Sequence, residues 1–354
     1  MKVLIVGFFT KTYMPYISNY EDQLKQKNIS YDVVCFDRDC TKKPEHIDNV
    51  YTFSHKTTAN RFAKLIPVLR YGNYVKKIIN KNNYDKIIVL TTMPGVLIYK
   101  LLVSKFQKKY IFDYRDYTYE KYSFFRKIVN RLIDNSYATF ISSPGYKKYF
   151  NNQSNIYISH NISNVSDEYK KISDLKNKDK ITIGFLGYVR YFDVNTKLIN
   201  DFKDNKKYSL LYVGTPFSDC DLDTYCKVNN IKNVTLIGKY DNSEKARLYK
   251  NIDIINSIYS LSSEEVQPAI PNRLYDAALF KKPIIVNKGT YLSEIVEKYK
   301  LGLIVDPFNE NIKSSVENYL KNFDGKDFSK NCNKFLSEIN SDRELMKKII
   351  NEFL

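Results

Sequence analysis

The sequence lacks any apolar run that approaches the roughly 20 residues of a membrane-spanning helix. Its apolar start, MKVLIVGFF, is too short for a secretory signal peptide, so we expect a cytoplasmic protein. The five cysteines are odd in number and include no CxxC pair, which argues against a disulfide framework and against a zinc site. The three histidines, at positions 46, 55 and 160, are too scattered to predict a metal centre or a hydrolytic triad.

A dinucleotide fingerprint is also missing, because no GxGxxG follows the first apolar run. Its absence disfavours dehydrogenase chemistry. The composition still supports a folded chain, since 43% of the residues are hydrophobic and 15% are aromatic. At 354 residues the chain is long for a single domain, so two α/β domains are the first expectation.

Positive charge is in large excess, with a formal net charge of +17. This excess favours an anionic partner such as nucleic acid or a membrane surface, although an AT-rich genome alone would enrich Lys, Asn, Ile and Tyr together. The charge is densest between Lys56 and Lys86, where eight basic residues accompany one acid, Asp85. Apolar residues alternate with this charge, which predicts an interfacial helix pair interrupted at Pro67 and Gly72. A surface helix with its apolar face in the core is the alternative.

Apolar runs of strand length recur along the chain with helical segments between them, as in parallel βαβ units. The predicted strands lie within residues 1–9, 31–37, 85–92, 108–114, 138–143, 181–190, 208–214, 233–239 and 252–258. The polar segment VSDEYKKISDLKNKDK, which follows Ser163 and Asn164, is the best linker candidate. We therefore predict one doubly wound domain at residues 1–165, a second at 166–340, and a short amphipathic helix at 341–354.

Charged side chains follow the strand within 108–114, namely Asp113, Arg115 and Asp116. Ligands of open parallel sheets bind beyond the carboxyl ends of the strands, so Asp116 and Arg115 are candidate catalytic residues. An alternative is that Arg115 and Asp116 form a structural ion pair with each other.

The stretch from Gln267 to Pro307 combines helix, strand, loop and second helix. Pro271 and Asn272 open a helix that reaches Phe280, and the apolar run PIIV predicts a buried strand. A second helix is predicted from Leu292, and the unpaired N–H groups at its start suit a diphosphate. An ordinary βα turn is the alternative.

Several segments of the second half follow one known pattern. They are the turn at residues 187–190, the strand endings YVG and LIG, and the segments IDIINS, PNRLYDAALFKKPIIV and YLSEIVEKYKLGLIVDP. With these segments the second half resembles the donor-binding domain of GT-B glycosyltransferases, in the large retaining family of cell-surface polysaccharide enzymes (glycosyl transferases group 1, family 4-like). The first half is more loosely similar, in its DYRD cluster, its SSPG turn and the asparagine that ends YISHN.

The resemblance implies a GT-B fold, in which two Rossmann-like doubly wound α/β domains face each other across a cleft. It implies an acceptor-binding first domain, a second domain for the nucleotide-sugar donor, and a C-terminal helix that crosses back to the first domain. The implied reaction is a retaining sugar transfer to a saccharide or polyprenyl-linked acceptor in capsule, exopolysaccharide or O-antigen synthesis. No cofactor is implied, because this type of fold generally needs no metal.

The resemblance also assigns residues to the sugar donor. Asp276 stands where the family has the acid that binds the donor ribose, whereas Pro268 occupies the place of the family's first acid, with Glu264 and Glu265 upstream. Arg190 stands near the family's diphosphate-binding basic residue, and a plain surface arginine is the alternative. The complete set of predicted donor-binding residues is Arg190, Lys239, Arg273, Asp276, Gly187, Thr290, Tyr291 and Leu292.

Three other interpretations stay open at this point. A sugar-nucleotide epimerase shares the two-domain fold but would be expected to place more acids and histidines in the cleft. A nucleic-acid-binding protein would group basic and aromatic residues with a recognised motif, which the sequence lacks. A catalytically inactive partner subunit is the third, because Pro268 replaces an expected acid.

Overall fold

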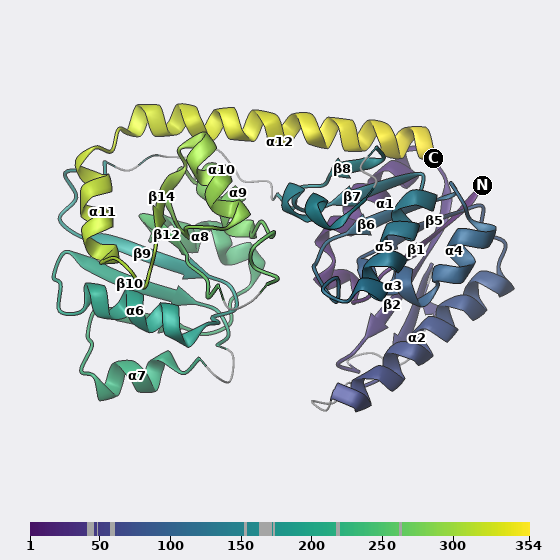
Figure 1. Cartoon of the computed structure of the whole chain (residues 1–354), viewed down its shortest axis with the longest axis horizontal. Helices are drawn as coiled ribbons and strands as arrows, with labels where there is room; N and C mark the ends of the chain where they lie inside the picture. Colours follow the sequence, from purple (N-terminus) through teal and green to yellow (C-terminus); the bar gives the residue numbers. More distant parts are fainter. Residues whose placement is uncertain are drawn as a thin grey trace. The chain divides into compact units, whose positions relative to one another are not determined.

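The computed structural model describes the chain except for residues 41–45, 48, 57–60, 152–153, 163–171, 173, 217–219 and 262–263. Two compact units emerge (Figure 1). Unit 1 comprises Met1–His160 and Ser341–Leu354, and unit 2 comprises Asn161–Asn340. Half of the segment predicted as a linker lies outside the described residues.

Unit 1 is built on a sheet with the strand order β3-β4-β2-β1-β5-β6-β7-β8 in the described part of the chain. Its strands are β1 (Lys2–Val6), β2 (Ser30–Asp37), β3 (His46–Ile47), β4 (Val50–Ser54), β5 (Lys86–Leu90), β6 (Tyr110–Tyr114), β7 (Ala138–Ile141) and β8 (Ile156–Ile158). All neighbouring strands are parallel except β3 and β4. The chain winds outward from β1 in both directions, which is the doubly wound order.

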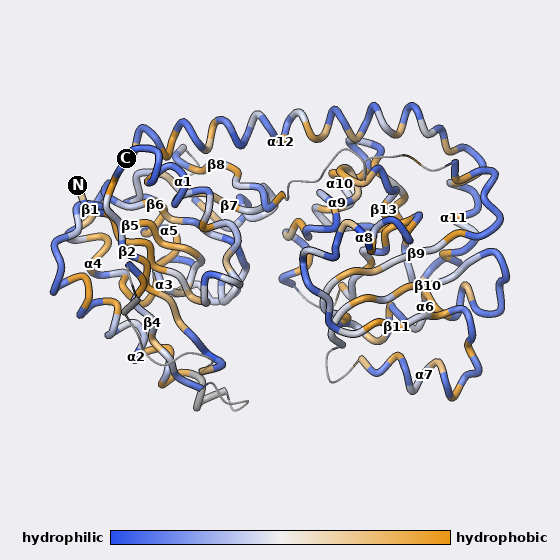
Figure 2. The backbone as a smooth tube through the Cα atoms, turned by 180° about the vertical axis from the view of Figure 1, so that it is seen from behind, coloured by the Kyte–Doolittle hydropathy of each residue, from blue (hydrophilic) through white to orange (hydrophobic). Residues whose placement is uncertain are grey.

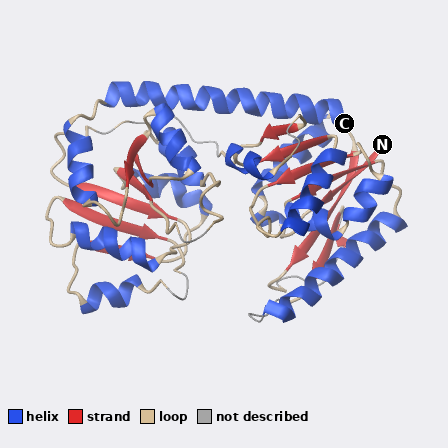
Figure 3. Ribbon diagram, in the orientation of Figure 1, coloured by secondary structure: helices blue, strands red, loops and turns tan. Residues whose placement is uncertain are grey.

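Helices cover both faces of this sheet (Figure 3). They are η1 (Lys11–Tyr13), η2 (Pro15–Ile17), α1 (Ser18–Gln26), α2 (Arg61–Lys81), α3 (Thr92–Leu97), α4 (Tyr99–Lys105), α5 (Ser123–Asn135) and η3 (Pro144–Tyr149). Leu4 and Val6 point to the side of α2 to α5, whereas Val3 and Ile5 point to the side of α1. Because both faces of β1 are buried, it is a nearly continuous apolar run, and Figure 2 shows the hydrophobic parts of the chain gathered along such strands.

The basic segment forms one helix, α2, so the predicted pair of helices is wrong. Pro67 lies inside α2, where it removes one backbone N–H without ending the helix. The helix also continues through its second predicted break, Gly72, which has a role in packing. A Cβ atom at Gly72 would come within 3.0 Å of the Leu97 side chain, so the glycine lets α2 approach α3 closely.

Unit 2 contains a wholly parallel sheet with the order β11-β10-β9-β12-β13-β14. Its strands are β9 (Ile181–Leu186), β10 (Tyr208–Val213), β11 (Val234–Ile237), β12 (Ile254–Ser257), β13 (Ile284–Asn287) and β14 (Gly302–Val305). Its helices are α6 (Phe192–Phe202), α7 (Leu222–Val228), η5 (Asn242–Glu244), α8 (Lys245–Lys250), α9 (Asn272–Leu279), α10 (Tyr291–Tyr299) and α11 (Ile312–Lys321). The chain again winds outward from its first strand, so the predicted α/β class with two doubly wound sheets is confirmed.

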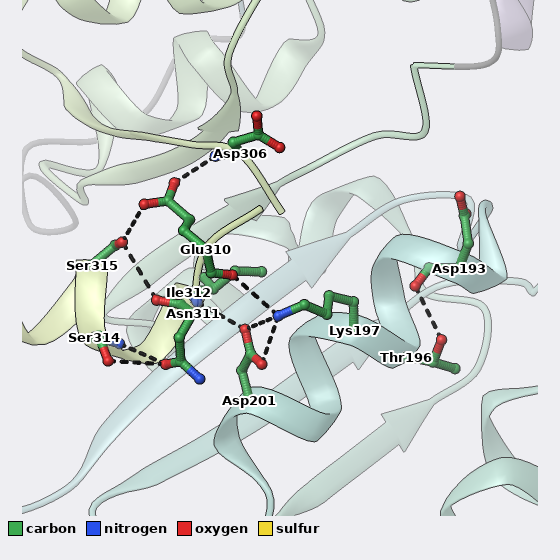
Figure 4. A network of polar contacts seen from close by, with 10 residues as sticks. All are labelled: Asp193, Thr196, Lys197, Asp201, Asp306, Glu310, Asn311, Ile312, Ser314 and Ser315. Atoms are coloured by element: carbon green, nitrogen blue, oxygen red, sulfur yellow. Dashed lines mark hydrogen bonds and ion pairs between the residues drawn. The ribbon is translucent and has the colours of Figure 1, made fainter. Parts of the chain in front are cut away.

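A polar network fixes α6 to the start of α11 (Figure 4). Lys197 donates to both oxygens of Asp201, at 2.7 and 2.6 Å, and to the Glu310 carbonyl at 3.2 Å. Asp201 also accepts the backbone N–H of Ile312 at 2.8 Å, the first amide of α11. This network holds α6, whose first turn lies next to the cavity described below.

The last helix, α12 (Gly325–Phe353), spans 29 residues and is far longer than the short helix predicted from Asp342. Phe328, Cys332 and Phe335 pack in the core of unit 2. Ile350 and Phe353 pack with β1 and α1 in unit 1. No helix in the described ranges is both long enough and apolar enough to cross a membrane.

Candidate functional site

A cavity of about 310 Å³ opens at the carboxyl end of β9 in unit 2. Its lining comes from the loop after β9, the segment before α8, the residue Tyr259 after β12, and the start of α9. The lining residues are Phe185, Leu186, Gly187, Tyr188, Arg190, Tyr191, Tyr240, Asn242, Lys245, Tyr259, Pro271, Asn272, Arg273 and Asp276. Four of the predicted donor-binding residues, Gly187, Arg190, Arg273 and Asp276, therefore share one cavity.

Positive charge dominates this cavity, because three basic side chains accompany a single carboxylate. Arg190 is 43% exposed, and its guanidinium lies 4.0 Å from a carboxylate oxygen of Glu265. Lys245 is 18% exposed and is the first residue of α8. The excess of cations makes the cavity suited to an anionic ligand.

Asp276 is almost fully buried in the second turn of α9. One oxygen lies 2.7 Å from the Lys245 Nζ, and the other accepts the Tyr249 hydroxyl at 2.9 Å. Burial raises the pKa of Asp276, while Lys245 opposes that rise. The carboxylate therefore holds Lys245 at the cavity wall.

Arg273 is buried and lies flat against an aromatic wall. Its guanidinium carbon is 3.8 Å from the ring centre of Phe185 and 5.1 Å from that of Tyr259. It donates to the Leu186 carbonyl at 3.2 Å and to the Tyr259 hydroxyl. Gly187, the residue after Leu186, has a φ of +130°, a conformation that favours glycine. This conformation lets the chain turn beside the Arg273 guanidinium.

Aromatic rings form much of the remaining wall, contributed by Phe185, Tyr188, Tyr191, Tyr240 and Tyr259. Tyr188 is 61% exposed, so its ring is available to a ligand. Aromatic faces stack on planar bases and on the apolar faces of sugar rings. The cavity thus pairs cations for phosphate with rings for the rest of a nucleotide.

The other predicted donor-binding residues lie outside this lining. Lys239 is exposed just after β11. At the start of α10, Thr290 and Ser293 cap each other in a capping box, and the Tyr291 amide donates to the Gln267 carbonyl at 2.9 Å. These internal bonds occupy three of the amides predicted to face a diphosphate, and Leu292 is buried.

Arg115 needs a correction, because its donors are used within unit 1. It pairs with Asp113, not with Asp116, at 2.6 and 2.8 Å. It also donates to the carbonyl and hydroxyl oxygens of Ser159, at 3.2 and 2.7 Å, and its guanidinium covers the Tyr16 ring. Since Arg115 is only 6% exposed, it joins β6 to the chain after β8 and does not reach a ligand.

Asp116, in contrast, is exposed, two residues after the end of β6. Its backbone carbonyl accepts the Thr92 hydroxyl at 3.3 Å, which ties its loop to the first residue of α3. The carboxylate therefore lies where ligands of a parallel sheet bind.

Lys245, Tyr240 and Asn242 were missed by the sequence analysis. They follow β11, at the strand end from which the sequence analysis selected Lys239. The spacing from Lys245 to Asp276 is 31 positions, so no local motif links the two residues.

The sequence matches no protein-family model and no curated protein. The structure, however, is similar to solved structures along nearly its whole length. HepE of Anabaena in complex with UDP matches with a TM-score of 0.70 at 14% identity, over 99% of each chain. Sucrose-phosphate synthase from Thermosynechococcus elongatus matches with a TM-score of 0.67 at 14% identity, over 99% of this chain and 95% of that one.

The lipopolysaccharide outer core galactosyltransferase WaaB matches with a TM-score of 0.66 at 12% identity, over 100% of this chain and 99% of that one. Identities this low establish a shared fold and leave the activity to be argued from the site. The two parallel α/β sheets of this chain have the GT-B fold of these glycosyltransferases.

Proposed function

We propose that this chain transfers a sugar from a nucleotide diphosphate sugar to a saccharide acceptor. The observation that carries the proposal is the cavity of unit 2, in which Arg190, Lys245 and Arg273 surround a space of about 310 Å³ with aromatic walls. Similar structures support the nucleotide class, since HepE is described in complex with UDP-glucose. We therefore take UDP and UDP-sugars as the first ligands to test.

The proposed chemistry needs positive charge where the leaving group departs. The bond between the anomeric carbon and the diphosphate oxygen breaks, and that oxygen keeps the electron pair. The acceptor hydroxyl forms the new glycosidic bond and releases its proton to the departing phosphate. Arg190 and Lys245 stabilise the growing charge of the diphosphate, so the proposal requires no metal.

We propose a retaining reaction, which needs no enzyme nucleophile when the acceptor attacks from the face that the diphosphate leaves. Asp116 in unit 1 is the carboxylate proposed to orient the acceptor and assist its proton. Of the amides at the start of α10, the Leu292 amide stays a prediction for a further donor contact, as does the side chain of Lys239.

A polysaccharide role is proposed by analogy with one protein that shares the fold. WaaB is a lipopolysaccharide outer core galactosyltransferase. We propose a saccharide acceptor of the same general kind, carried on a polyprenyl lipid, in the synthesis of a surface polysaccharide. Purified protein incubated with a UDP-sugar and a saccharide acceptor should release UDP, and isomerisation of the sugar without acceptor would instead favour an epimerase.

Ligand binding is tested first by thermal stabilisation with a panel of nucleotide sugars. A ligand present at 100 times its Kd stabilises the folded state by about 2.7 kcal/mol. We expect one nucleotide to stand out and the effect to disappear when Arg190 and Asp276 are both changed to alanine. Equal stabilisation of this double variant would exclude the cavity as the donor site.

We also propose that α2 contacts an anionic membrane surface on the cytoplasmic side. The helix contains six basic and no acidic residues. Leu65, Ile66 and Leu69 are more than half exposed, whereas the second half of α2 packs in the core. Exposed aliphatic side chains beside basic ones suit the boundary between lipid headgroups and acyl chains.

Vesicle sedimentation tests this membrane contact. Wild-type protein should bind vesicles that contain phosphatidylserine and not vesicles of phosphatidylcholine alone, and added salt should weaken the binding. The double variant Leu65→Ser, Leu69→Ser should lose most of the binding. Val228→Ser removes an equally apolar side chain, 75% exposed on unit 2, and serves as the control.

A further inference from the structure

Arg38 lies in unusual surroundings at the carboxyl end of β2 in unit 1. Its guanidinium carbon is 4.0 Å from the ring centre of Phe8, 4.6 Å from that of Phe9 and 5.3 Å from that of Phe36. The side chain is half-buried among these rings. Contacts between a cation and aromatic faces contribute about 0.5–2 kcal/mol each, depending on how far the cation is desolvated.

This cation makes no hydrogen bond and no ion pair with any residue that the structure describes, and its Nε atom is buried without a partner. The buried arginines Arg115 and Arg273 differ, because their terminal nitrogens donate to carboxylate, carbonyl or hydroxyl oxygens. Burial lowers the pKa of Arg38, which reflects the cost of desolvating the charge. Asp39, the next residue, offsets part of this cost, but no carboxylate in the described ranges pairs directly with Arg38.

Arg38 lies at the carboxyl end of a strand, β2, and parallel sheets bind their ligands at such strand ends. Strand β1 lies between β2 and β5, with Val6 opposite both Val34 and Val89. The connections of these two neighbours run on opposite faces of the sheet, because α1 and α2 belong to different core clusters. In doubly wound sheets, ligands bind beyond the carboxyl ends of the strands where the connections change direction, which in unit 1 is between β1 and β5. Phe8 and Phe9, which contact Arg38, directly continue β1.

A second, independent observation concerns Thr91, the residue directly after β5, whose backbone conformation is unusual. Thr91 adopts φ of +72° and ψ of 166°, a conformation almost restricted to glycine. Such a conformation costs about 1–3 kcal/mol for a β-branched residue and is concentrated at ligand-binding sites. The Thr91 hydroxyl is also buried without a hydrogen-bond partner, although its amide donates to the Asp113 carbonyl at 2.8 Å.

From these observations we propose that the carboxyl ends of β1 and β5 form a second anion-binding site, with Arg38 as its cation. The ligand is a phosphate or carboxylate group of the acceptor. The anion site stands on the geometry of unit 1 alone, whereas its assignment to the acceptor rests on the proposed function. A planar guanidinium can form two parallel bonds to either group.

Calorimetric titration with inorganic pyrophosphate tests the site in protein already saturated with UDP, so that the cavity of unit 2 is filled. We expect binding to be at least tenfold weaker in Arg38→Met, and intermediate in Arg38→Lys, which keeps the charge without the fork. Arg126→Met, an exposed arginine of α5 in the same unit, should bind as the wild type does. A parallel titration with glucuronate distinguishes a carboxylate ligand from a phosphate ligand.

Thermal unfolding without any anion provides the second readout. Arg38→Met removes the desolvated charge together with its contacts to the rings and keeps an apolar side chain against them, so the two effects oppose each other and its melting temperature should stay close to that of the wild type. A lower melting temperature together with unchanged pyrophosphate binding would overturn the proposal. If UDP does not bind at all, the proposed function fails, and the dependence of pyrophosphate binding on Arg38 still decides the anion site.

Discussion

The pairing of Lys245 with Asp276 leads to a prediction that separates ligand binding from stability. Lys245→Met keeps the length of the side chain and removes the ammonium group from the cavity. A hydrogen bond to a charged group contributes about 1.5–3 kcal/mol. We therefore expect the Kd for UDP to rise about ten- to hundredfold. Isothermal titration of UDP into the purified variant measures this change.

A matched control is available in the same unit. Lys232→Met removes an ammonium group from an exposed position outside the cavity lining, so its Kd for UDP should stay within about twofold of the wild-type value. Equal losses in both variants, or a larger loss in Lys232→Met, would refute the placement of the ligand in this cavity.

Stability should respond differently. Lys245→Met leaves the buried Asp276 carboxylate without its cation, so the melting temperature should fall. Adding Asp276→Asn removes the unpaired charge and should restore most of the melting temperature. UDP affinity should remain low in this double variant. Recovery of affinity together with stability would show that Lys245 acts through folding alone.

Three further predictions concern the elements around the sites. Asp201→Asn should lower the free energy of unfolding of unit 2 by about 1–3 kcal/mol in urea, because it weakens the bonds to Lys197 and α11; Asp223→Asn, in an exposed pair, should change nothing measurable. Burial raises the pKa of Glu120 above its ordinary 4.5, so the native state binds that proton more tightly than the unfolded chain does. The stability of the wild type relative to Glu120→Gln should therefore fall as pH rises from about 4.5 through the native pKa, and a pH-independent difference would contradict this. Arg115→Lys should lower the melting temperature by several degrees and leave UDP affinity unchanged, whereas lost transfer at an unchanged melting temperature would restore a catalytic role.

The layered α/β architecture could be predicted from the sequence because it depends on local apolar runs. Strands buried on both faces, such as β1 and β13, are short and nearly continuous in hydrophobic residues. The lengths of α2 and α12 could not be predicted in the same way. Pro67 looks like a helix break although the helix continues through it, and the close packing of Gly72 against Leu97 joins residues that are distant in sequence.

The residues of the candidate site divide in the same way into those that could be predicted from the sequence and those that could not. Residues in the loop that follows a strand, such as Gly187 and Arg190 after β9, could be selected because their position follows from the topology. The partner of a side chain depends on its direction in space. Arg115 therefore pairs with Asp113 and not with its neighbour Asp116, and Lys245 enters the cavity where Lys239 does not.

Sugar transfer by the purified protein tests the central proposal most directly. The measurement follows UDP release and the glycosylated acceptor by mass spectrometry, for the wild type and for the Arg190→Ala, Asp276→Ala double variant. The account predicts acceptor-dependent UDP release by the wild type and a loss of at least a hundredfold in the double variant, because a cation and the carboxylate that holds Lys245 are both removed. Full activity of the double variant would contradict it.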